Sequence, residues 1–337
     1  MASSTASAPF SLATFSIPGG APAAGLVAGD RVLKLAAAPG LTGADSMLGL
    51  LEYWDRNFPA LQGLATAVAA GDAGLPATPV ALSAVRLHAP VPAPRQIFCS
   101  GANYKKHVAQ IIVAQTMSET AHMSQQERWE FGVKKMDERA RSGTPYFFLK
   151  GQSTVTGPFD PVVLPHDVTQ PDWELELGVV IGRPARRVSR GNALDHVAGY
   201  VVVNDVTTRE RVNRKEGDLK EMGMNWVASK SSPTFLPMGP YLVPAAFVPD
   251  PQQLQIVLKL NGETMQNEST ADMIFGVARL IEYASEACLL QPGDVICTGS
   301  PAGNGVHYKR FLKPGDVLEG SITGLGTQRN ACVAEPR

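Results

Sequence analysis

The sequence predicts an α+β fold that is mainly β and has few helices. Glycine and proline are frequent, at 32 and 26 of 337 residues, which favours many turns and short strands over a helical bundle. Two Pro-Gly-Asp turns, at 292–294 and 314–316, each precede a strand-like run. Hydrophobic residues make up 44% of the chain and charged residues 18%, as in a globular protein large enough to bury a core without disulfides.

Charge and hydropathy exclude several classes of protein. The chain has 30 Lys and Arg residues against 31 Asp and Glu residues, which argues against a nucleic-acid-binding surface and a polybasic membrane anchor. No run reaches the ~18 apolar residues of a membrane-spanning helix, and the N-terminus lacks the features of a signal peptide. We therefore expect a cytoplasmic protein with no nucleic-acid or membrane partner, and reduced thiols at Cys99, Cys288, Cys297 and Cys332.

The N-terminal part, residues 1–92, is predicted to be a small domain without an active site, and residues 1–10 are expected to be disordered. The alternating run GLVAGDRVLKLA predicts two strands joined by a Gly-Asp turn. One amphipathic helix is predicted over residues 46–57, and VPAPR at 91–95 is typical of a linker. A dinucleotide-binding domain is disfavoured because no GxGxxG motif follows a strand here.

The remaining part, residues 93–337, is predicted to be the catalytic domain. It opens with a buried-type strand at 96–99. A helix is predicted to begin after Ser124, which has capping-box spacing to a glutamate, and to end at Gly143. A second helix is predicted from about residue 270 to 288, and short strands dominate the rest.

Two acidic residues on one strand are the sharpest local signal. Apolar residues alternate along 172–181, so Glu174 and Glu176 share the other face of the strand with Cα atoms ~7 Å apart. A solvated strand face is the usual explanation of such a pair. However, the next strand, 199–205, is almost wholly apolar and ends in Asp205. A buried carboxylate is costly unless it is neutralised, and three carboxylates suit a hard divalent cation such as Mg²⁺ or Mn²⁺.

Several motifs follow one another over about residues 95–333. They are Ser100-Gly101-Ala102-Asn103-Tyr104 with His107, Phe148-Leu149-Lys150, Glu174-x-Glu176, Gly199-Tyr200, Asn204-Asp205-Val206-Thr207-Thr208-Arg209, Ser229-Lys230, Gly239-Pro240, Asn261-Gly262-Glu263 and Thr298-Gly299-Ser300-Pro301-Ala302-Gly303. This ordered set resembles the fumarylacetoacetate hydrolase family. The resemblance implies the family's mixed β-sandwich roll, a Mg²⁺ or Mn²⁺ ion on Glu174, Glu176 and Asp205, and a homodimer. Family members act on 2-oxo and 1,3-dioxo acids, most often cleaving a C–C bond of an acylpyruvate-like compound by hydrolysis.

The resemblance also assigns roles to other residues. Lys230 matches the lysine that the family uses as an electrostatic partner. Arg209 could clamp a substrate carboxylate through two hydrogen bonds, or pair with an acidic neighbour. Residues expected to bind the substrate are Tyr104, Arg209, Thr298, Gly299 and Ser300.

His107 is the candidate general base, because a neutral imidazole can activate water near pH 7. In hydrolases of the family a glutamate three residues further on orients this histidine within a mobile lid, but here that position is Gln110. Either another acid replaces it, with Glu119 the nearest in sequence, or the site works differently. The predicted lid, about residues 105–143, is also longer than is usual in the family.

These observations leave three functions open. The first is a divalent-metal-dependent hydrolase that cleaves a C–C bond in a 2,4-dioxo acid such as an acylpyruvate or fumarylpyruvate, in breakdown of aromatic compounds or sugars. The second, favoured by Gln110, is a metal-dependent decarboxylase, isomerase or hydratase of an oxo acid. The third is a non-catalytic small-molecule-binding protein on the same fold. A serine hydrolase is disfavoured because no G-x-S-x-G motif occurs.

Overall fold

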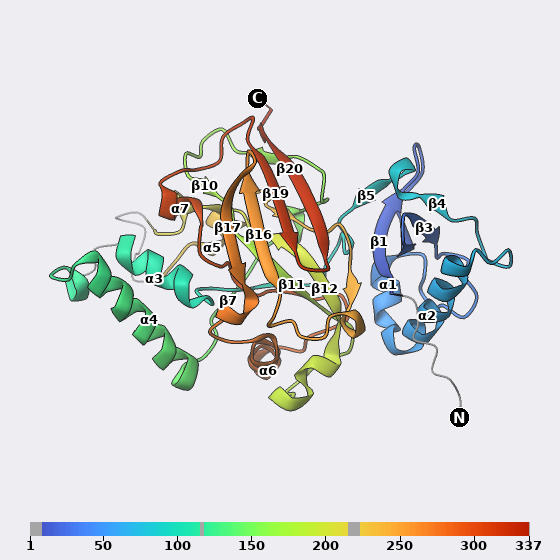
Figure 1. The fold of residues 1–337 in the computed structure, drawn as a ribbon, viewed down its shortest axis with the longest axis horizontal. Helices are drawn as coiled ribbons and strands as arrows, with labels where there is room; N and C mark the ends of the chain where they lie inside the picture. The colour runs from blue at the N-terminus through green and yellow to red at the C-terminus, as the bar shows by residue number, and fades with distance from the viewer. Residues whose placement is uncertain (1–8, 115–117, 215–222, 337) are drawn as a thin grey trace.

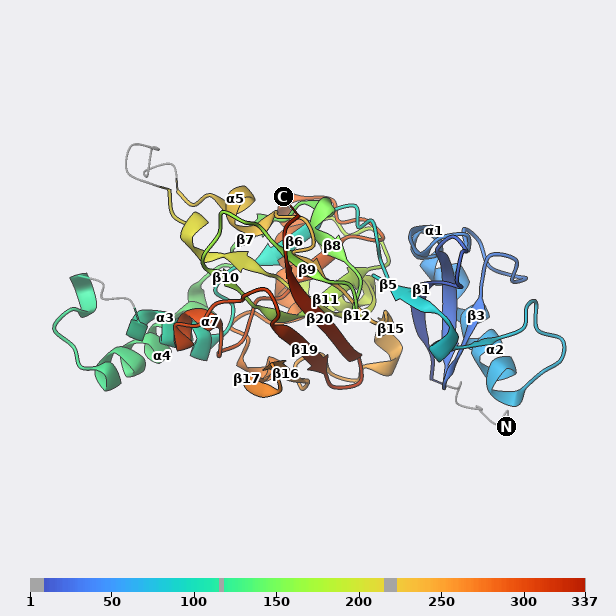
Figure 2. The ribbon, with the colours of Figure 1, turned by 90° about the horizontal axis from the view of Figure 1, so that it is seen from above.

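The molecule contains one β-sheet near the N-terminus and a second group of β-sheets formed by the rest of the chain (Figure 1). The computed structural model describes residues 9–114, 118–214 and 223–336. In both views the N-terminal sheet lies at one end of the molecule, the larger sheets lie in the middle, and two helices, α3 (Lys105–Ala114) and α4 (Gln125–Ser142), extend from the other end (Figure 2). The predicted mixed fold, mainly β with few helices, is confirmed.

The N-terminal sheet has the strand order β4-β3-β2-β1-β5 and is antiparallel throughout. The hairpin of β2 and β3 pairs Ala28 with Arg31, so the predicted Gly-Asp turn between two strands is confirmed. Gly29 takes φ +59° in that turn, a conformation that costs glycine little. The strands are β1 (Ser11–Ser16), β2 (Ala23–Ala28), β3 (Arg31–Lys34), β4 (Val80–Ala81) and β5 (Arg86–His88).

Two helices accompany this sheet where the sequence predicted one over residues 46–57. α1 (Met47–Glu52) ends at Tyr53, whose backbone is not helical, and α2 (Trp54–Ala70) then continues well past the predicted end. α2 contains Pro59, although a proline removes a helical hydrogen bond. The buried side chains of α2 recur along one face, so packing against the sheet outweighs this local cost; they include Trp54, Leu61, Ala65 and Val68.

Two larger sheets form the second group and pack face to face. The first has the order β15-β12-β11-β18-β6-β7 and the second the order β17-β16-β19-β20-β9. Two short pairs, β10 with β13 and β14 with β8, complete it. The strands are β6 (Ile97–Ser100), β7 (Phe147–Leu149), β8 (Val155–Thr156), β9 (Val162–Leu164), β10 (Pro171–Asp172), β11 (Leu175–Ile181), β12 (Val197–Asn204), β13 (Thr207–Thr208), β14 (Leu236–Pro237), β15 (Val243–Pro244), β16 (Gln255–Leu260), β17 (Glu263–Ser269), β18 (Val295–Cys297), β19 (Val317–Ile322) and β20 (Gly326–Ala334).

Strand β11 is buried on both faces, whereas the sequence predicted one face in the core. Leu175, Leu177 and Val179 point into a core shared with the second large sheet, as the alternation predicted. The opposite face is covered too, because Val180 belongs to a second apolar cluster that reaches the N-terminal sheet. A solvated strand face for the two glutamates is therefore excluded.

The helices of the second group are short apart from α3, α4 and α6. The predicted capping box is confirmed, since Ser124 and Glu127 bond each other's backbone N–H groups, and α4 ends at Gly143 as predicted. The helices are α3, α4, α5 (Trp226–Lys230), α6 (Val277–Ala287) and α7 (Gly305–Tyr308). Short 3₁₀ turns lie at Leu82–Ala84, Ser118–Thr120, Gln152–Thr154, Arg190–His196, Arg209–Arg211, Ala245–Phe247 and Thr270–Asp272.

The predicted start of the helix at about residue 270 is wrong, because α6 begins only after Gly276. The backbone N–H of Ile274 donates to the Asn103 carbonyl, and that of Phe275 donates to the Asn103 side chain. These contacts hold the segment in a non-helical path. No helix among residues 9–114, 118–214 and 223–336 is long and apolar enough to cross a membrane.

We predict that Asn57→Ala lowers the free energy of unfolding by ~1–3 kcal/mol, the cost of leaving buried backbone groups without partners. The Asn57 amide is fully buried and bonds both backbone polar groups of Thr42 and the carbonyl of Leu50, at 2.8–2.9 Å. Urea unfolding measures the loss. Asn192→Ala, at an exposed position, is the control and should change stability by less than ~0.5 kcal/mol. Equal losses for the two variants would contradict this role.

Candidate metal centre

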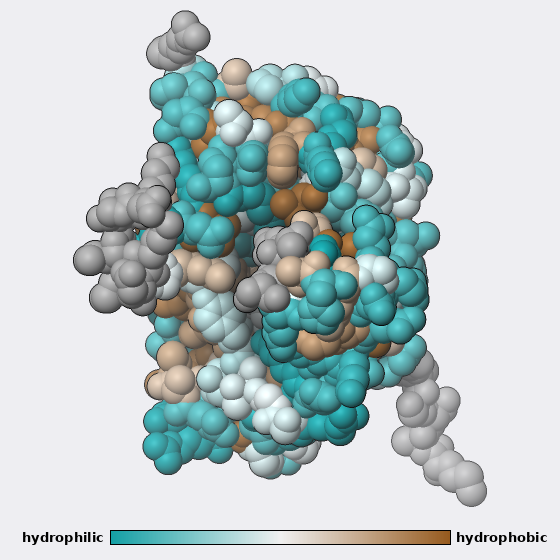
Figure 3. All heavy atoms as spheres, turned by 90° about the vertical axis from the view of Figure 1, so that its left-hand side faces the viewer, coloured by the Kyte–Doolittle hydropathy of each residue, from teal (hydrophilic) through white to brown (hydrophobic). Residues whose placement is uncertain are grey.

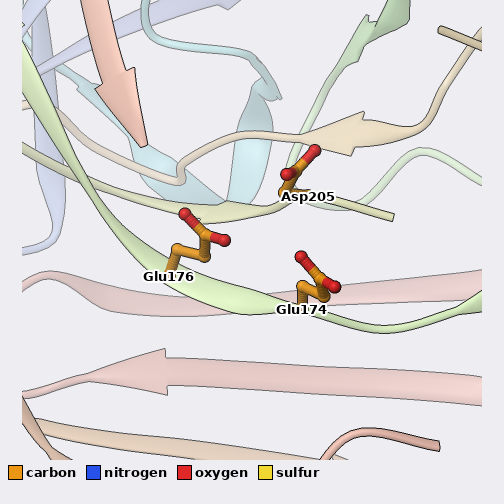
Figure 4. Close-up of side chains that lie close together, drawn as sticks. All are labelled: Glu174, Glu176 and Asp205. Atoms are coloured by element: carbon orange, nitrogen blue, oxygen red, sulfur yellow. The ribbon is translucent and has the colours of Figure 1, made fainter. Parts of the chain in front are cut away.

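Three buried carboxylates meet where β11 and β12 run side by side. The ligand oxygens of Glu174, Glu176 and Asp205 all lie within 4.8 Å of one another. The two strands are antiparallel and pair Glu176 with Val203, so the residue following β12 comes next to the start of β11. Figure 4 shows Glu176 on β11 and Glu174 just before it, with both carboxylates directed to the side on which Asp205 lies. The structure thus brings together the three predicted ligands.

Two lysines neutralise part of this negative charge. Lys230 Nζ donates to Glu174 Oε2 at 2.8 Å and to Asp205 Oδ2 at 2.5 Å. Lys150 Nζ donates to the other oxygen of Asp205 at 2.6 Å and to the Val206 carbonyl at 3.0 Å. Burial alone would lower the pKa of Lys230, but the carboxylates raise it above its ordinary value. Lys230 therefore stays charged at neutral pH.

The guanidinium of Arg209 provides a third positive charge. Its Nε donates to Asp172 Oδ2 at 2.8 Å, and its Nη2 lies 2.6 Å from Glu174 Oε1. Of the two expected roles, the structure shows the pairing with acidic neighbours. Burial opposes ionisation of Glu174, but Lys230 and Arg209 together lower its pKa to about 2.

Glu176 is in a different electrostatic position from the other two ligands. In the part of the chain that the structure describes, its one recorded hydrogen bond is from the Gly299 N–H to Oε2, at 2.7 Å, and it forms no ion pair. Burial, and then the negative charge of Asp205, raise the pKa of Glu176 well above its usual range. A ligand set made only of oxygens, with one carboxylate left without a cation, fits a hard divalent ion.

The glycine-rich turn at residues 298–303 supports this cluster. The hydroxyl of Thr298 donates to the Leu177 carbonyl at 3.0 Å, and Ser300 Oγ accepts hydrogen bonds from Gln266 and Asn304, each at 3.0 Å. Gly299 takes φ +96°, and a Cβ atom there would meet the Asn103 side chain at 2.9 Å. Glycine is therefore needed where the backbone N–H reaches Glu176.

Tyr104 lies beside the cluster and is completely buried. Burial, followed by the charge of Glu176, raises the pKa of its phenol well above the ordinary value, so the hydroxyl stays protonated. The neighbouring Asn103, which sequence reasoning gave no role, donates to the carbonyls of Phe275 and Thr298 at 3.0 and 2.8 Å. It thereby joins the segment before α3 to the glycine-rich turn.

His107 is buried in the first turn of α3. Burial lowers the pKa of His107 to about 4, with Arg209 and Lys230 adding to the effect and Glu174 opposing it. The imidazole is therefore neutral near pH 7 and able to accept a proton. Figure 3 shows the end of the molecule at which α3 and α4 lie. The surface there carries mainly hydrophilic and intermediate side chains, with small apolar areas between them.

The structure does not bring the two expected orienting residues to His107. The amide oxygen of Gln110 accepts a hydrogen bond from the Gly303 N–H at 3.0 Å, so it holds the glycine-rich turn. Glu119 is exposed and pairs with Lys135 of α4 at 3.2 Å. Neither side chain has a recorded hydrogen bond to His107 among the described residues.

Two functional residues, Lys150 and Asp172, were missed as site residues by sequence reasoning. In the sequence Lys150 directly follows the apolar run of β7, and a charged residue after an apolar strand is the signal that singled out Asp205. In the structure its side chain is fully buried. Asp172 begins the strand-like run that carries the glutamates, but nothing local shows that it meets Arg209.

A match over residues 96–333 to the family model for the C-terminal part of fumarylacetoacetate hydrolase decides the family. The chain belongs to the fumarylacetoacetate hydrolase family. A 2,4-didehydro-3-deoxy-L-rhamnonate hydrolase of Sphingomonas sp. (strain SKA58) is 50% identical over 188 residues, which is 55% of this chain and 64% of that relative. The matched part therefore spans less than two thirds of that relative's length.

Solved structures of the fumarylacetoacetate hydrolase family share the fold along almost the whole chain. A maleylpyruvate hydrolase from Sphingobium sp. SYK-6, solved with manganese(II) and pyruvate, superposes with a TM-score of 0.69 at 28% identity, covering 97% of this chain and 100% of that one. A probable 2-hydroxyhepta-2,4-diene-1,7-dioate isomerase from Mycobacterium abscessus gives 0.71 at 29% identity, with the same coverage. The family expected from the sequence is confirmed, and its members include hydrolases and isomerases.

We predict that Glu176→Gln abolishes most Mn²⁺ binding but leaves the metal-free protein at least as stable as wild type. The variant removes a ligand and also a buried carboxylate that repels Asp205. A bound ion stabilises by RT ln(1 + [L]/Kd), so Mn²⁺ should raise the Tm of the wild type and not that of the variant. Glu319→Gln, which affects a surface pair with Arg329, is the control. A Mn²⁺-dependent Tm shift that survives in Glu176→Gln would contradict this ligand set.

A second prediction concerns how the free energy of unfolding depends on pH below neutrality. Since the pKa of His107 falls from 6.5 to about 4 on folding, the unfolded chain binds the proton first as pH drops. This contribution to stability is complete above pH ~6.5 and is lost towards pH ~4, at up to ~1.4 kcal/mol per pH unit. Urea unfolding in chelator between pH 6.5 and 5 should show a shallower pH slope for His107→Gln than for wild type. Asn192→Ala, at an exposed position and without a titrating side chain, should keep the wild-type slope; identical slopes for all three proteins would refute the assignment.

Proposed function

We propose that the protein is a divalent-metal-dependent hydrolase that cleaves a C–C bond in a 2,4-dioxo acid. The observation that carries the proposal is the buried cluster of Glu174, Glu176 and Asp205 with the charged Lys230 inside it and the neutral His107 nearby. Two relatives, named as hydrolases of 2,4-didehydro-3-deoxy-L-rhamnonate and of maleylpyruvate, support an oxo-acid substrate. A sugar-derived or aromatic-derived dioxo acid is the substrate class that these names favour.

Glu174, Glu176 and Asp205 would hold the cation, Mg²⁺ or Mn²⁺. When bound, the ion supplies Lewis-acid stabilisation of negative charge that develops on substrate oxygens. Manganese in the Sphingobium neighbour supports a hard divalent ion at this position. The ammonium of Lys230 adds a fixed positive charge beside the same carboxylates, which would favour the negative charge of an enolate oxygen over the uncharged carbonyl of the substrate.

Proton transfer would fall to His107. Its neutral imidazole takes a proton from the water that attacks the C4 carbonyl of the substrate. The bond between C3 and C4 then breaks, C4 leaves as a carboxylic acid, and C3 accepts a proton to give the 2-oxo acid product. One water is consumed and both fragments are closed-shell acids, so atoms and charge balance. Tyr104, kept protonated by its buried position, can donate a hydrogen bond to a substrate oxygen.

A second candidate is isomerisation or decarboxylation of an oxo acid without attack by water. The observation that favours it is the absence of a recorded contact between His107 and Gln110 or Glu119 in the described residues, since an anion beside the imidazole would assist water activation. The Mycobacterium abscessus neighbour is named as a probable isomerase. Three further expectations stay predictions: the lid role of residues 105–143, the homodimer and the cytoplasmic location.

The test is a panel of 2,4-dioxo acids and oxaloacetate, offered to the Mn²⁺- or Mg²⁺-loaded protein, with products identified by mass spectrometry. We expect a 2-oxo acid plus a carboxylic acid, loss of activity in chelator, and a ~10²–10⁴-fold lower kcat for His107→Ala. His122→Ala, an exposed histidine between α3 and α4, is the matched control and should keep wild-type kcat. Release of carbon dioxide, or a product of unchanged mass, would replace hydrolysis by the second candidate.

A further inference from the structure

A fourth acidic side chain, Asp172, lies outside the proposed ligand set and is completely buried. Its Oδ1 accepts the Gly305 N–H at 2.6 Å, and its Oδ2 accepts the Val306 N–H at 3.1 Å. The same Oδ2 accepts Arg209 Nε at 2.8 Å. Asp172 is therefore fixed by backbone donors on one side and fixes a guanidinium on the other.

Arg209 connects this fixed carboxylate to the metal centre. While Nε bonds Asp172, Nη2 lies 2.6 Å from Glu174 Oε1, and the arginine side chain is 18% exposed. A guanidinium is planar and presents its donors in a rigid fork, so fixing Nε also fixes the direction of Nη2. Asp172, which is not itself a proposed ligand, thus fixes the position of Arg209 beside Glu174 and partly neutralises its charge.

We propose that Asp172 is a positioning residue of the metal centre, which sets through Arg209 how strongly Glu174 holds the divalent cation. Asp172 and Glu174 are both anionic partners of the Arg209 guanidinium. Without the negative charge of Asp172, Glu174 becomes the main anionic partner of Arg209, and the guanidinium competes more strongly with the cation for that carboxylate. This inference rests on the proposed metal site and adds the residue that tunes it.

The test measures the Kd for Mn²⁺ by electron paramagnetic resonance of the free ion, on full-length protein stripped of metal. Asp172→Asn keeps the size and polarity of the side chain and should raise the Kd ~10-fold, within the ~10–100-fold seen for residues that orient metal ligands. The matched control is Asp316→Asn. Asp316 also joins an arginine, Arg310, to a backbone donor, the Lys313 N–H, in a turn before β19. Its replacement should change the Kd less than twofold.

A double-mutant cycle separates positioning from simple loosening of the fold. In an Arg209→Met background, Asp172→Asn should add less than a twofold change, because the residue that transmits its effect is gone. If Arg209→Met does not fold, Arg209→Lys serves instead, since one ammonium cannot form both contacts. Circular dichroism checks that each variant is folded.

The outcomes distinguish this inference from the proposed function. An unchanged Kd for Asp172→Asn, or an equal effect with and without Arg209, overturns the positioning role while the metal site stands. Wild-type protein that binds no Mn²⁺ overturns the metal site and the inference together. A ~10-fold effect that disappears in the Arg209 background supports the role.

Discussion

The neutralisation of the buried carboxylates is the constraint on which the site depends. An isolated charge taken out of water costs several kcal/mol, even after the protein relaxes. Lys150, Lys230 and Arg209 offset this cost at Asp205 and Glu174, through contacts of 2.5–2.8 Å. Among the residues that the structure describes, Glu176 receives only the backbone N–H of Gly299. Positive charge is therefore missing at one corner of the cluster, and this local shortage is what a divalent cation can satisfy.

The register of β11 against β12 links this cluster to the core. Leu175 and Leu177 point into the apolar layer shared with the second sheet, so Glu174 and Glu176 must point the other way. A slip by one residue would send both glutamates into that layer and the leucines towards the lysines. The hydrophobic core thus specifies the geometry of the candidate metal centre, and a sequence that fills the core well also places the ligands.

Local patterns predicted the parts of the fold and site that depend on neighbours in sequence, such as the capping box at Ser124 and the glutamate pair at the start of β11. They failed for the length of α2, which was predicted to end at residue 57 and continues to Ala70 while packing against the sheet. They also failed for partners far apart in the chain. Lys150 lies 55 residues from Asp205, and Gln110 lies 193 residues from Gly303. Only the folded sheets bring such pairs together, so no spacing rule reveals them.

The glutamine at position 110 follows from the same balance of charge. Its amide oxygen accepts the Gly303 N–H, which joins α3, the helix that carries His107, to the turn whose Gly299 N–H bonds Glu176. A glutamate could accept the same hydrogen bond, but it would add negative charge near a buried cluster that already contains a carboxylate without a cation. A neutral amide keeps the helix attached to the turn without that repulsion. The contact to Gly303 thus gives Gln110 a structural role in this protein that does not involve His107.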